Sequence, residues 1–562
     1  MSKTNGKSSL DPITVEVIRN KLDGIANEME LTLVRSAFST IVKEGLDASA
    51  SIFTLEGETL AQAIAIPIHL VTLLPMVRHL LAEKPVSEMS EGDVFVMNDP
   101  YLGGTHLPDI AVIMPVFYEG QPIAISATMT HHQDVGGMAP GSTPTNATEI
   151  FQEGLRIPLL KLMDRGELNQ TFMAILRRNV RIPEVVTGDL MAEISACSIG
   201  ARRLKEVAAT YGNNFLISVF DELLDRSETM TKEALRRIPD GTYSYTDYLD
   251  NDGVDLDCMV PITVTARITE GDIELDFEGS SPQVRGPFNC VPSGSLAAAC
   301  FALRAVTDPD QLIPNNGGCF RPIALRLPPG SIVNPNEPAP VGCRTSTIKR
   351  VTSVVLGALR KAVPEQVPAD PGGEEVILHF GGRRADGRGF VTSQILIGGS
   401  GAAKSRDGVD VIETDATNCM NIPAEALELE APIRVHRASL APDSGGAGER
   451  RGGLGAWLEY EILEGEMTIT YRGERHFCRA AGSEAGEAGG AASAEIVRGD
   501  GSVHSIPSKE VARMLAGDRL IIRTAGGGGF GDPKKRPRNE VRADIENGKV
   551  TAKAAAEAYG FE

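Results

Sequence analysis

Apolar side chains recur every three or four residues near the start of the chain, which is the spacing of one face of an α-helix. The positions that follow this rhythm are Ile18, Leu22, Ile25, Met29 and Leu33. Asp11 and Pro12 stand just before them, and this pair is typical of an N-cap followed by proline at the first helical position. We therefore expect a long amphipathic helix from residue 12 to about residue 38.

The pattern then changes to short apolar runs separated by turn residues, which is typical of strands. We expect strands at residues 50–54, 93–97, 110–116 and 122–130, and a second helix at 70–81. The Glu119-Gly120 pair predicts that the last two of these strands form a hairpin. Helical spacing returns over 166–237. Beyond residue 241 the runs alternate again, at 243–248, 262–269 and 272–277, with one helix expected at 295–306 among Gly- and Pro-rich loops.

These patterns predict an α+β protein of several subdomains. A chain of 562 residues is too long to fold around one core. We expect an N-terminal domain at 1–165, a helical block at 166–240, a strand-rich middle domain with long loops at 241–440, and a β-rich C-terminal domain with glycine-rich loops at 441–562.

The charge balance narrows the range of partners. The chain has 75 acidic and 55 basic residues and a formal net charge of −20. Binding to phosphate backbones and anionic membranes is mainly electrostatic, so we expect neither nucleic acid nor a membrane as partner. Residues 1–12 lack the apolar core of a secretory signal, and no apolar run is long enough to span a bilayer. The eight cysteines form no Cys-x-x-Cys pair, which favours reduced thiols in a cytoplasmic protein.

Three of the nine histidines, His106, His131 and His132, lie close together in runs rich in carboxylates and glycine. His106 shares a proline-bearing loop with Asp109, and His131 begins the loop after the strand at 122–130. The predicted hairpin returns His131 to the His106–Asp109 loop. Two imidazoles and a carboxylate, with a second carboxylate to complete the set, suit zinc, manganese or iron with one position open to water. The N-terminal domain is therefore the predicted metal-site domain.

Other chemistry has weaker support in the sequence. The remaining histidines lack such neighbours and are expected to be ordinary core or surface residues: His69, His79, His379, His436, His476 and His504. The glycine run at 526–531 is not followed by the Lys-Ser/Thr of a phosphate-binding loop. The loop at 444–455 lacks a preceding Rossmann strand, and there is no Gly-x-Ser-x-Gly elbow. No ATP site is recognisable in this chain.

At these residues the sequence resembles the hydantoinase B/oxoprolinase family. Members include the B subunits of ATP-dependent N-methylhydantoinases and related lactamases, one subunit of acetone- and acetophenone-type carboxylases, and the second half of fused 5-oxoprolinases. The resemblance covers nearly the whole chain through motifs in the family's order: Asp11-Pro12-Ile13, Glu44-Gly45-Leu46-Asp47, Ala61-Gln62-Ala63, Ile66-Pro67-Ile68-His69, 98–109, 131–137, 279–287, 451–455 and 526–533.

The resemblance implies a division of labour between two subunits. An actin-like ATPase, the A subunit, phosphorylates the carbonyl oxygen of the substrate, and the B subunit holds a divalent metal whose water attacks the activated ring carbon. By motif, the metal ligands are Asp47, His106, Asp109 and His131. His132 and Asp134 are implied as catalytic residues that orient a ligand imidazole or handle protons.

The resemblance thus predicts a metal-dependent hydrolase subunit that opens cyclic amides such as hydantoins, oxoproline or lactams. ATP is used by the partner, and the complex is expected to be a heterotetramer. Two alternatives remain: a subunit of an acetone- or acetophenone-type carboxylase, and a non-catalytic subunit with a structural metal. The chain is short for an acetone carboxylase subunit, which favours ring opening. Leu46-Asp47-Ala48-Ser49 replaces the Arg-Asp-Phe-Ser frequent in the family, which indicates a reshaped pocket.

Overall fold

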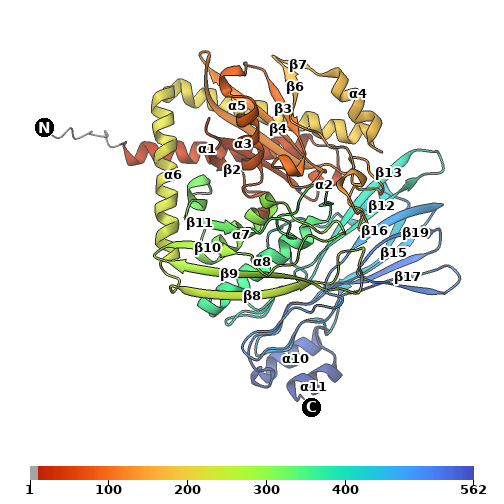
Figure 1. Ribbon diagram of the computed structural model, residues 1–562. Helices are drawn as coiled ribbons and strands as arrows, with labels where there is room; N and C mark the ends of the chain where they lie inside the picture. Colours follow the sequence, from red (N-terminus) through yellow and green to blue (C-terminus); the bar gives the residue numbers. More distant parts are fainter. Residues whose placement is uncertain (1–9, 562) are drawn as a thin grey trace.

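A seven-stranded antiparallel sheet organises the N-terminal part of the chain (Figure 1). The computed structural model describes residues 10–561, so the expectation for the segment before Leu10 falls outside the described residues. The strand order is β2-β1-β5-β4-β3-β6-β7. The strands are β1 (Ala48–Phe53), β2 (Thr59–Gln62), β3 (Val94–Met97), β4 (Asp109–Tyr118), β5 (Gln121–His131), β6 (Leu160–Asp164) and β7 (Glu167–Leu168).

Helices cover both faces of this sheet. On one face α3 (Leu73–Glu83) contacts β4 and β5, and on the other α5 (Pro183–Tyr211) crosses the same strands. The long helix α1 (Pro12–Ser36) packs on α5, and Asp11 caps it by accepting the backbone N–H groups of Ile13 and Thr14, as predicted. The other helices of this region are α2 (Thr40–Lys43), α4 (Gln170–Asn179) and α6 (Asn213–Leu235).

A second sheet and two buried helices form the middle of the molecule. The sheet order is β11-β10-β9-β8, from β8 (Gly241–Leu249), β9 (Val260–Thr269), β10 (Asp272–Asp276) and β11 (Ile323–Arg326). The helix α7 (Pro292–Thr307) was predicted, but α8 (Arg344–Ala362) was not. Charged Lys349 and Arg350 are fully buried in α8. They interrupt its apolar periodicity, which is why the sequence pattern did not reveal the helix.

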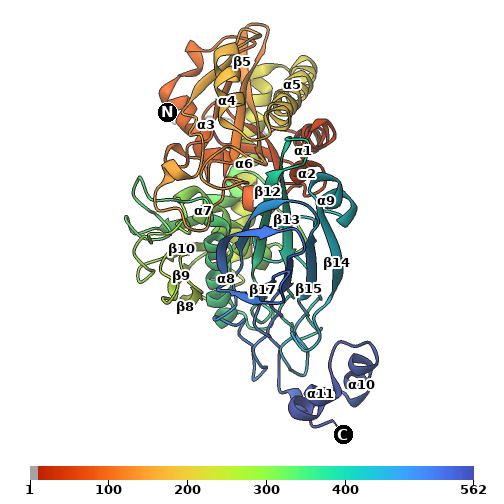
Figure 2. The same ribbon diagram turned by 90° about the vertical axis from the view of Figure 1, so that its right-hand side faces the viewer.

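Two further sheets build the C-terminal half (Figure 2). One has the order β13-β12-β16-β19 and the other β14-β15-β20-β17-β18, so strands from both sides of residue 440 pair with one another. The predicted boundary at 440 therefore does not separate two folding units, although the α+β class is confirmed. The strands are β12 (Glu375–Arg383), β13 (Gly389–Ile397), β14 (Ile433–Leu440), β15 (Ala456–Ile462), β16 (Glu466–Arg472), β17 (Ser493–Val497), β18 (Val503–Ile506), β19 (Lys509–Leu515) and β20 (Arg519–Arg523).

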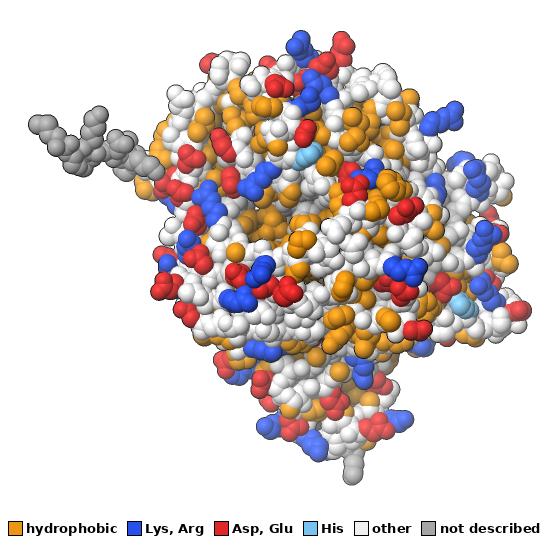
Figure 3. Space-filling model, viewed as in Figure 1, with side chains coloured by type: hydrophobic (Ala, Val, Ile, Leu, Met, Phe, Trp, Pro, Cys, Tyr) orange, Lys and Arg blue, Asp and Glu red, His pale blue; other side chains and the backbone are white. Residues whose placement is uncertain are grey.

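Short helices flank these sheets. The helix α9 (Ala424–Glu430) contacts β13 and β14, whereas α10 (Arg538–Glu546) and α11 (Ala552–Tyr559) form a small projection at the far end of the molecule from the N-terminal sheet (Figures 1 and 2). Acidic and basic side chains are interspersed over the face in Figure 3, without a basic patch. No helix between residues 10 and 561 has the length and apolar character needed to cross a membrane.

The glycine-rich runs of the sequence form a backbone layer rather than a phosphate loop. Four segments lie side by side, and we call them together the glycine layer: 398–401, 444–455, 480–490 and 526–531. Gly527 donates its N–H to Gly453, which donates to Ser400, and Gly529 donates to Glu487. An added β-carbon at Gly527 would lie 2.0 Å from the Ser400 carbonyl oxygen, so only glycine allows this approach.

Candidate metal centre

The β4–β5 hairpin carries two of the predicted metal ligands at directly paired positions. Asp109 begins β4 and His131 ends β5, and the two residues are partners in the antiparallel register. Glu119 and Gly120 form the turn with positive φ angles of 51° and 74°, as a tight hairpin with right-handed strand twist requires. The predicted hairpin and its return of His131 to the His106–Asp109 loop are confirmed.

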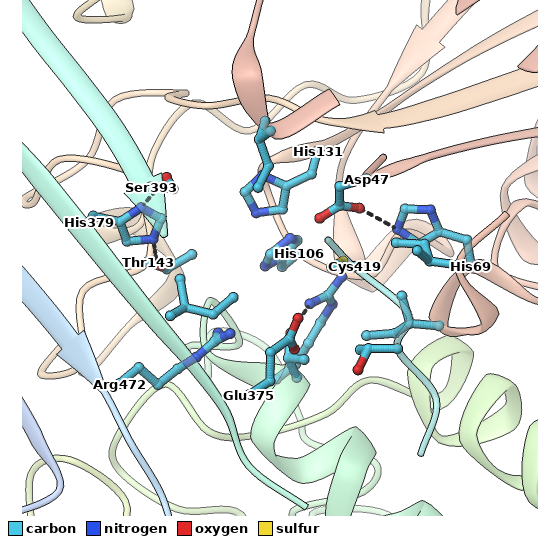
Figure 4. Close-up of a pocket in the computed structure, with 17 residues that line it drawn as sticks. Asp47, His69, His106, His131, Thr143, Glu375, His379, Ser393, Cys419 and Arg472 are labelled. Atoms are coloured by element: carbon cyan, nitrogen blue, oxygen red, sulfur yellow. Dashed lines mark hydrogen bonds and ion pairs between the residues drawn. The ribbon is translucent and has the colours of Figure 1, made fainter. Parts of the chain in front are cut away.

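His106, Asp109 and His131 form a compact buried group, which we call the triad. One candidate ligand atom from each lies within 4.8 Å of those of the other two. His106 Nε2 is 3.2 Å from Asp109 Oδ1, and the two imidazole centroids are 5.0 Å apart. Figure 4 shows both rings facing the centre of the cavity. Mixed nitrogen and oxygen donors at this spacing fit a first-row divalent cation.

A backbone contact fixes the orientation of His106. Its Nδ1 lies 3.0 Å from the Gly342 carbonyl oxygen, which can only accept, so Nδ1 carries the proton and Nε2 turns its lone pair to the triad. The Glu153 carboxylate accepts the N–H groups of Val341 and Gly342 at 3.1 and 2.7 Å and thereby holds this carbonyl in place. The arrangement is the one that a metal-ligating histidine needs.

The electrostatics of the triad also favour cation binding. Burial raises the pKa of Asp109, but the positive charges of a protonated His106 and of the Arg344 guanidinium, 2.6 Å from the carboxylate, outweigh it and hold the pKa well below its usual range. Arg344 keeps its charge when His106 is neutral. Burial and the neighbouring His106 keep the pKa of His131 well below its usual value, and burial and Arg344 lower that of His106. A carboxylate and two neutral imidazoles are the protonation states that bind metal ions. The residues therefore fit a divalent cation.

Three parts of the chain meet around the triad to close a small cavity. Its free volume is about 20 Å³, which is room for one water molecule or an ion. The N-terminal part of the chain contributes Asp47, His69, His106 and His131, and the start of α8 contributes Arg344 and Thr345. The C-terminal sheets contribute Glu375, His379, Ser393 and Arg472. Ile41, Ile66 and Ile68 supply apolar wall.

Asp47, which only the family resemblance suggested, lines this cavity just outside the triad. Its backbone oxygen accepts the N–H of His131 at 3.2 Å, because β1 pairs with β5. Its carboxylate Oδ1 lies 3.5 Å from His69 Nε2 (Figure 4). Burial, and then the neighbouring Asp109, raise the pKa of Asp47 well above its usual value. A bound cation would counter that effect, since it stabilises the carboxylate form.

The expectation that His69 and His379 are ordinary core or surface residues is wrong, because of where the two side chains lie. Both line the cavity. His69 faces Asp47, and His379 lies between Thr143 and Ser393, 2.7 Å from each hydroxyl oxygen. His69 stands in the Ile66-Pro67-Ile68-His69 motif of the family resemblance, a signal that the sequence analysis did not apply to this histidine. His379 has no local sequence signal, because its strand reaches the cavity from a distant part of the chain.

His132 and Asp134 face away from the triad. His132 Nε2 pairs with Glu193 Oε1 at 3.0 Å, and Asp134 pairs with Arg181 at 2.8 Å. Neither is among the described residues that line the cavity. Successive residues of a strand point to opposite sides, so His131 entering the cavity turns its neighbour His132 toward α5. The predicted orienting contacts of these two residues with a ligand imidazole are thus corrected.

Sequence analysis missed Arg344, Glu375 and Arg472 at the cavity. Arg344 is 235 residues from its partner Asp109, so no local pattern could connect them. Burial, followed by the nearby Glu413 carboxylate, raises the pKa of Glu375 to about 7. Its Oε2 has no hydrogen-bond partner among the described residues.

A buried carboxyl group on α1 makes stability depend on pH. Burial raises the pKa of Glu30 from its usual 4.5 to about 8, and Oε2 has no partner among the described residues. The folded chain thus holds a proton that the unfolded chain releases between pH 4.5 and 8, and stability falls as the pH rises through this window.

We expect Glu30→Gln to stabilise the protein by on the order of 1 kcal/mol at pH 8.5 and by little at pH 4.5, measured by urea unfolding. Glu557→Gln, at an exposed site, is the control; an equal gain at both pH values contradicts the prediction.

Comparison with known proteins places these observations in context. A family model described as hydantoinase B/oxoprolinase matches residues 11–533. The chain is 34% identical to the beta subunit of the caprolactamase of Pseudomonas jessenii, over 98% of this chain and 96% of that one. It is 31% identical to the B subunit of a putative D-/L-hydantoinase of a Pseudomonas species, over 98% and 95% of the two chains.

Two solved structures share the fold over nearly the whole chain. The ATP-dependent caprolactamase from Pseudomonas jessenii matches with a TM-score of 0.90 and 32% identity, over 98% of this chain and 96% of that one. A nucleotide-free acetone carboxylase structure also matches with a TM-score of 0.90, over 98% and 79% of the two chains. Its identity is 20%, so this second likeness concerns the fold alone.

Proposed function

The chain belongs to the hydantoinase B/oxoprolinase family, and on that premise we propose that it is the metal-binding hydrolase subunit of an ATP-dependent cyclic amidase. The observation that carries the proposal is the buried triad, whose donor atoms and protonation states suit a divalent cation. The family resemblance seen in the motifs is confirmed. We propose His106, Asp109 and His131, together with Asp47, as the ligands of zinc, manganese or iron.

The surrounding residues prepare this centre for hydrolysis. When bound, the cation supplies Lewis acidity and lowers the pKa of a water molecule towards neutrality. Arg344 compensates the charge of Asp109, the Gly342 carbonyl orients His106, and His69 contacts the Asp47 carboxylate. The isoleucines of the wall exclude bulk water, which strengthens these electrostatic contacts. Glu375, with a pKa near neutrality, is the cavity residue we propose for proton handling, in place of His132 and Asp134.

We further propose that a partner performs the ATP chemistry. An unstrained amide resists attack by water, so an ATP-dependent amidase must first activate the carbonyl group. In this chain the run at 526–531 is part of the glycine layer. It does not form a phosphate-binding loop between a strand and a following α-helix. The names of two relatives carry subunit designations. An actin-like ATPase of the hydantoinase A type, in a heterotetramer with this chain, is the proposed partner, and a small cyclic amide is the proposed substrate.

Reconstitution with a hydantoinase A-type ATPase tests the function. We expect opening of a hydantoin, 5-oxoproline or a lactam only when both subunits, ATP and a divalent metal are present, with ring-opened product measured by mass spectrometry. Omitting this chain, or replacing ATP with a non-hydrolysable analogue, should abolish product. Bicarbonate-dependent carboxylation of a ketone by the same complex, without ring opening, would identify the carboxylase alternative instead.

A further inference from the structure

Arg472 differs from the other buried arginines of the described chain because it lacks a carboxylate partner. Six arginines are at most 4% exposed, and five of them form ion pairs with aspartate: Arg344, Arg350, Arg451, Arg475 and Arg536. Arg472 is 2% exposed, and no carboxylate of residues 10–561 lies within 4.0 Å of its guanidinium. Its Nε and Nη2 have no hydrogen-bond partner within the same range. The Glu375 carboxylate is near enough for Arg472 to lower its pKa, but it does not contact the guanidinium within 4.0 Å. Burying a charge without a direct partner is costly, so this guanidinium is suited to a further anion.

Arg472 reaches the cavity of the triad. It is the last residue of β16 and pairs in register with Ile377 of β12. Both residues line the cavity, and Figure 4 shows the Arg472 side chain extending from its strand towards the centre that His106 and His131 face. The missing anion would therefore lie beside the proposed metal ligands.

The start of α8 adds a second attraction for an anion. This helix of 19 residues begins at Arg344, its N-cap Cys343 makes no side-chain capping bond, and Arg344 and Thr345 line the cavity. The Arg472 guanidinium is also a neighbour of the Cys343 thiol. A helix N-terminus presents backbone N–H groups and a partial positive charge, which favour phosphate and other oxyanions. Arg344 lines the same cavity, and its Nε has no hydrogen-bond partner in the described chain.

We propose that Arg472 and the N-terminus of α8 bind the phosphoryl group of the activated substrate, a cyclic amide phosphorylated on its carbonyl oxygen, next to the triad. The inference rests on the proposed function, because the partner supplies that phosphoryl group. A planar guanidinium with two free donors matches two oxygens of a phosphoryl group. The cavity admits only a water molecule or an ion, so the substrate enters as the three parts of the wall move apart.

Inorganic phosphate, which shares the chemistry of the phosphoryl group, is the first probe. The full-length metal-loaded chain is titrated with phosphate by calorimetry, alongside Arg472→Gln, Arg472→Lys and the control Arg513→Gln, whose side chain on β19 is 80% exposed. We expect saturable binding that weakens about 10- to 100-fold in Arg472→Gln, weakens less in Arg472→Lys, and is unchanged in Arg513→Gln. Metal content and melting temperature of each sample are measured in parallel and should not change.

Equal phosphate affinity of Arg472→Gln and the wild type would overturn the proposal, because the anion would then bind elsewhere or on the metal alone. Absence of saturable binding to the wild type would overturn it as well. If Arg472→Gln fails to fold, the phosphate affinity of Arg472→Lys is compared with that of the wild type instead. A wild-type chain without metal affinity would instead refute the proposed function, and phosphate titration of the metal-free chain would still test Arg472.

A second arm separates the substrate's phosphoryl group from free phosphate. In the reconstituted complex, Arg472→Gln should lower kcat/KM for ring opening about 10- to 100-fold, while the ATP hydrolysis of the partner continues. Normal ring opening by a variant that has lost phosphate binding would show that the site serves free phosphate only and would overturn the substrate assignment.

Discussion

Replacing His106 with alanine is expected to empty the metal centre and to lower ATP-dependent ring opening by about 1,000-fold or more. The substitution removes Nε2, which is 3.2 Å from Asp109 Oδ1, and leaves two of the three donors of the triad. Metal content by elemental analysis and turnover of the reconstituted complex measure the two effects. His131→Ala should give the same result, because its imidazole supplies the other nitrogen donor.

The fold should survive the loss of this side chain. The imidazole contributes one neutral hydrogen bond to the Gly342 carbonyl, and an unmade bond of this kind costs about 1–3 kcal/mol. Circular dichroism and thermal melting should therefore show a folded chain. The control is His504→Ala, since His504 is 45% exposed and pairs with Glu510 on the surface.

Two results would refute the catalytic assignment. Full metal content in both His106→Ala and His131→Ala would mean that the ligands lie elsewhere. If both variants unfold and added metal does not restore the fold, the metal is structural, which is the non-catalytic alternative. The pair of variants and the folding measurement together separate the ligand question from the stability question.

The sequence revealed the part of this site that local chain geometry determines. The hairpin of β4 and β5 follows from two apolar runs and the Glu119-Gly120 turn, and that register alone places Asp109 opposite His131. His106 follows because its loop leads directly into β4. Only the family resemblance pointed to Asp47, because its approach to His131 depends on the pairing of β1 with β5. That pairing has no local signal in the sequence.

The rest of the cavity depends on contacts between distant parts of the chain. Arg344 and Arg472 enter from α8 and β16, and the first lies on a helix whose buried charges hide its periodicity. The orientation of His132 was missed for a different reason. Clustering in sequence suggested a shared site, but the alternation of side chains at the end of β5 sends His131 and His132 to opposite sides.

Replacing Gly527 with alanine is expected to prevent folding of the C-terminal half or to destabilise it by more than about 4 kcal/mol. The new β-carbon would lie 2.0 Å from the Ser400 carbonyl oxygen and 2.3 Å from its carbonyl carbon. These are backbone atoms, so no side-chain rotation relieves the clash. Movement of the Ser400 segment would break the hydrogen bonds that join Gly453 to Ser400 and Gly527 to Gly453. Soluble yield and urea unfolding measure the loss.

The same substitution at Gly499 provides a matched control. Gly499 also lies in the C-terminal half, but a β-carbon there meets no atom within 4 Å. Gly499→Ala should keep wild-type yield and stability within about 0.5 kcal/mol. Normal stability of Gly527→Ala would show that the glycine layer tolerates side chains, and it would contradict the structural role assigned to these runs.

The glycine layer adjoins the strand that forms one wall of the metal centre, so the Gly527 substitution should also affect activity. Gly372 donates its N–H to Gly399, and the Glu374 carboxylate accepts the N–H of Ala525 at the edge of the glycine layer. The next residue, Glu375, begins β12, the strand that carries His379 into the cavity. A displaced layer would move this wall away from the triad, which lies at the β4–β5 hairpin of the N-terminal sheet and keeps that hairpin. Any folded fraction of Gly527→Ala should therefore retain metal but lose ring-opening activity, whereas His106→Ala should lose both.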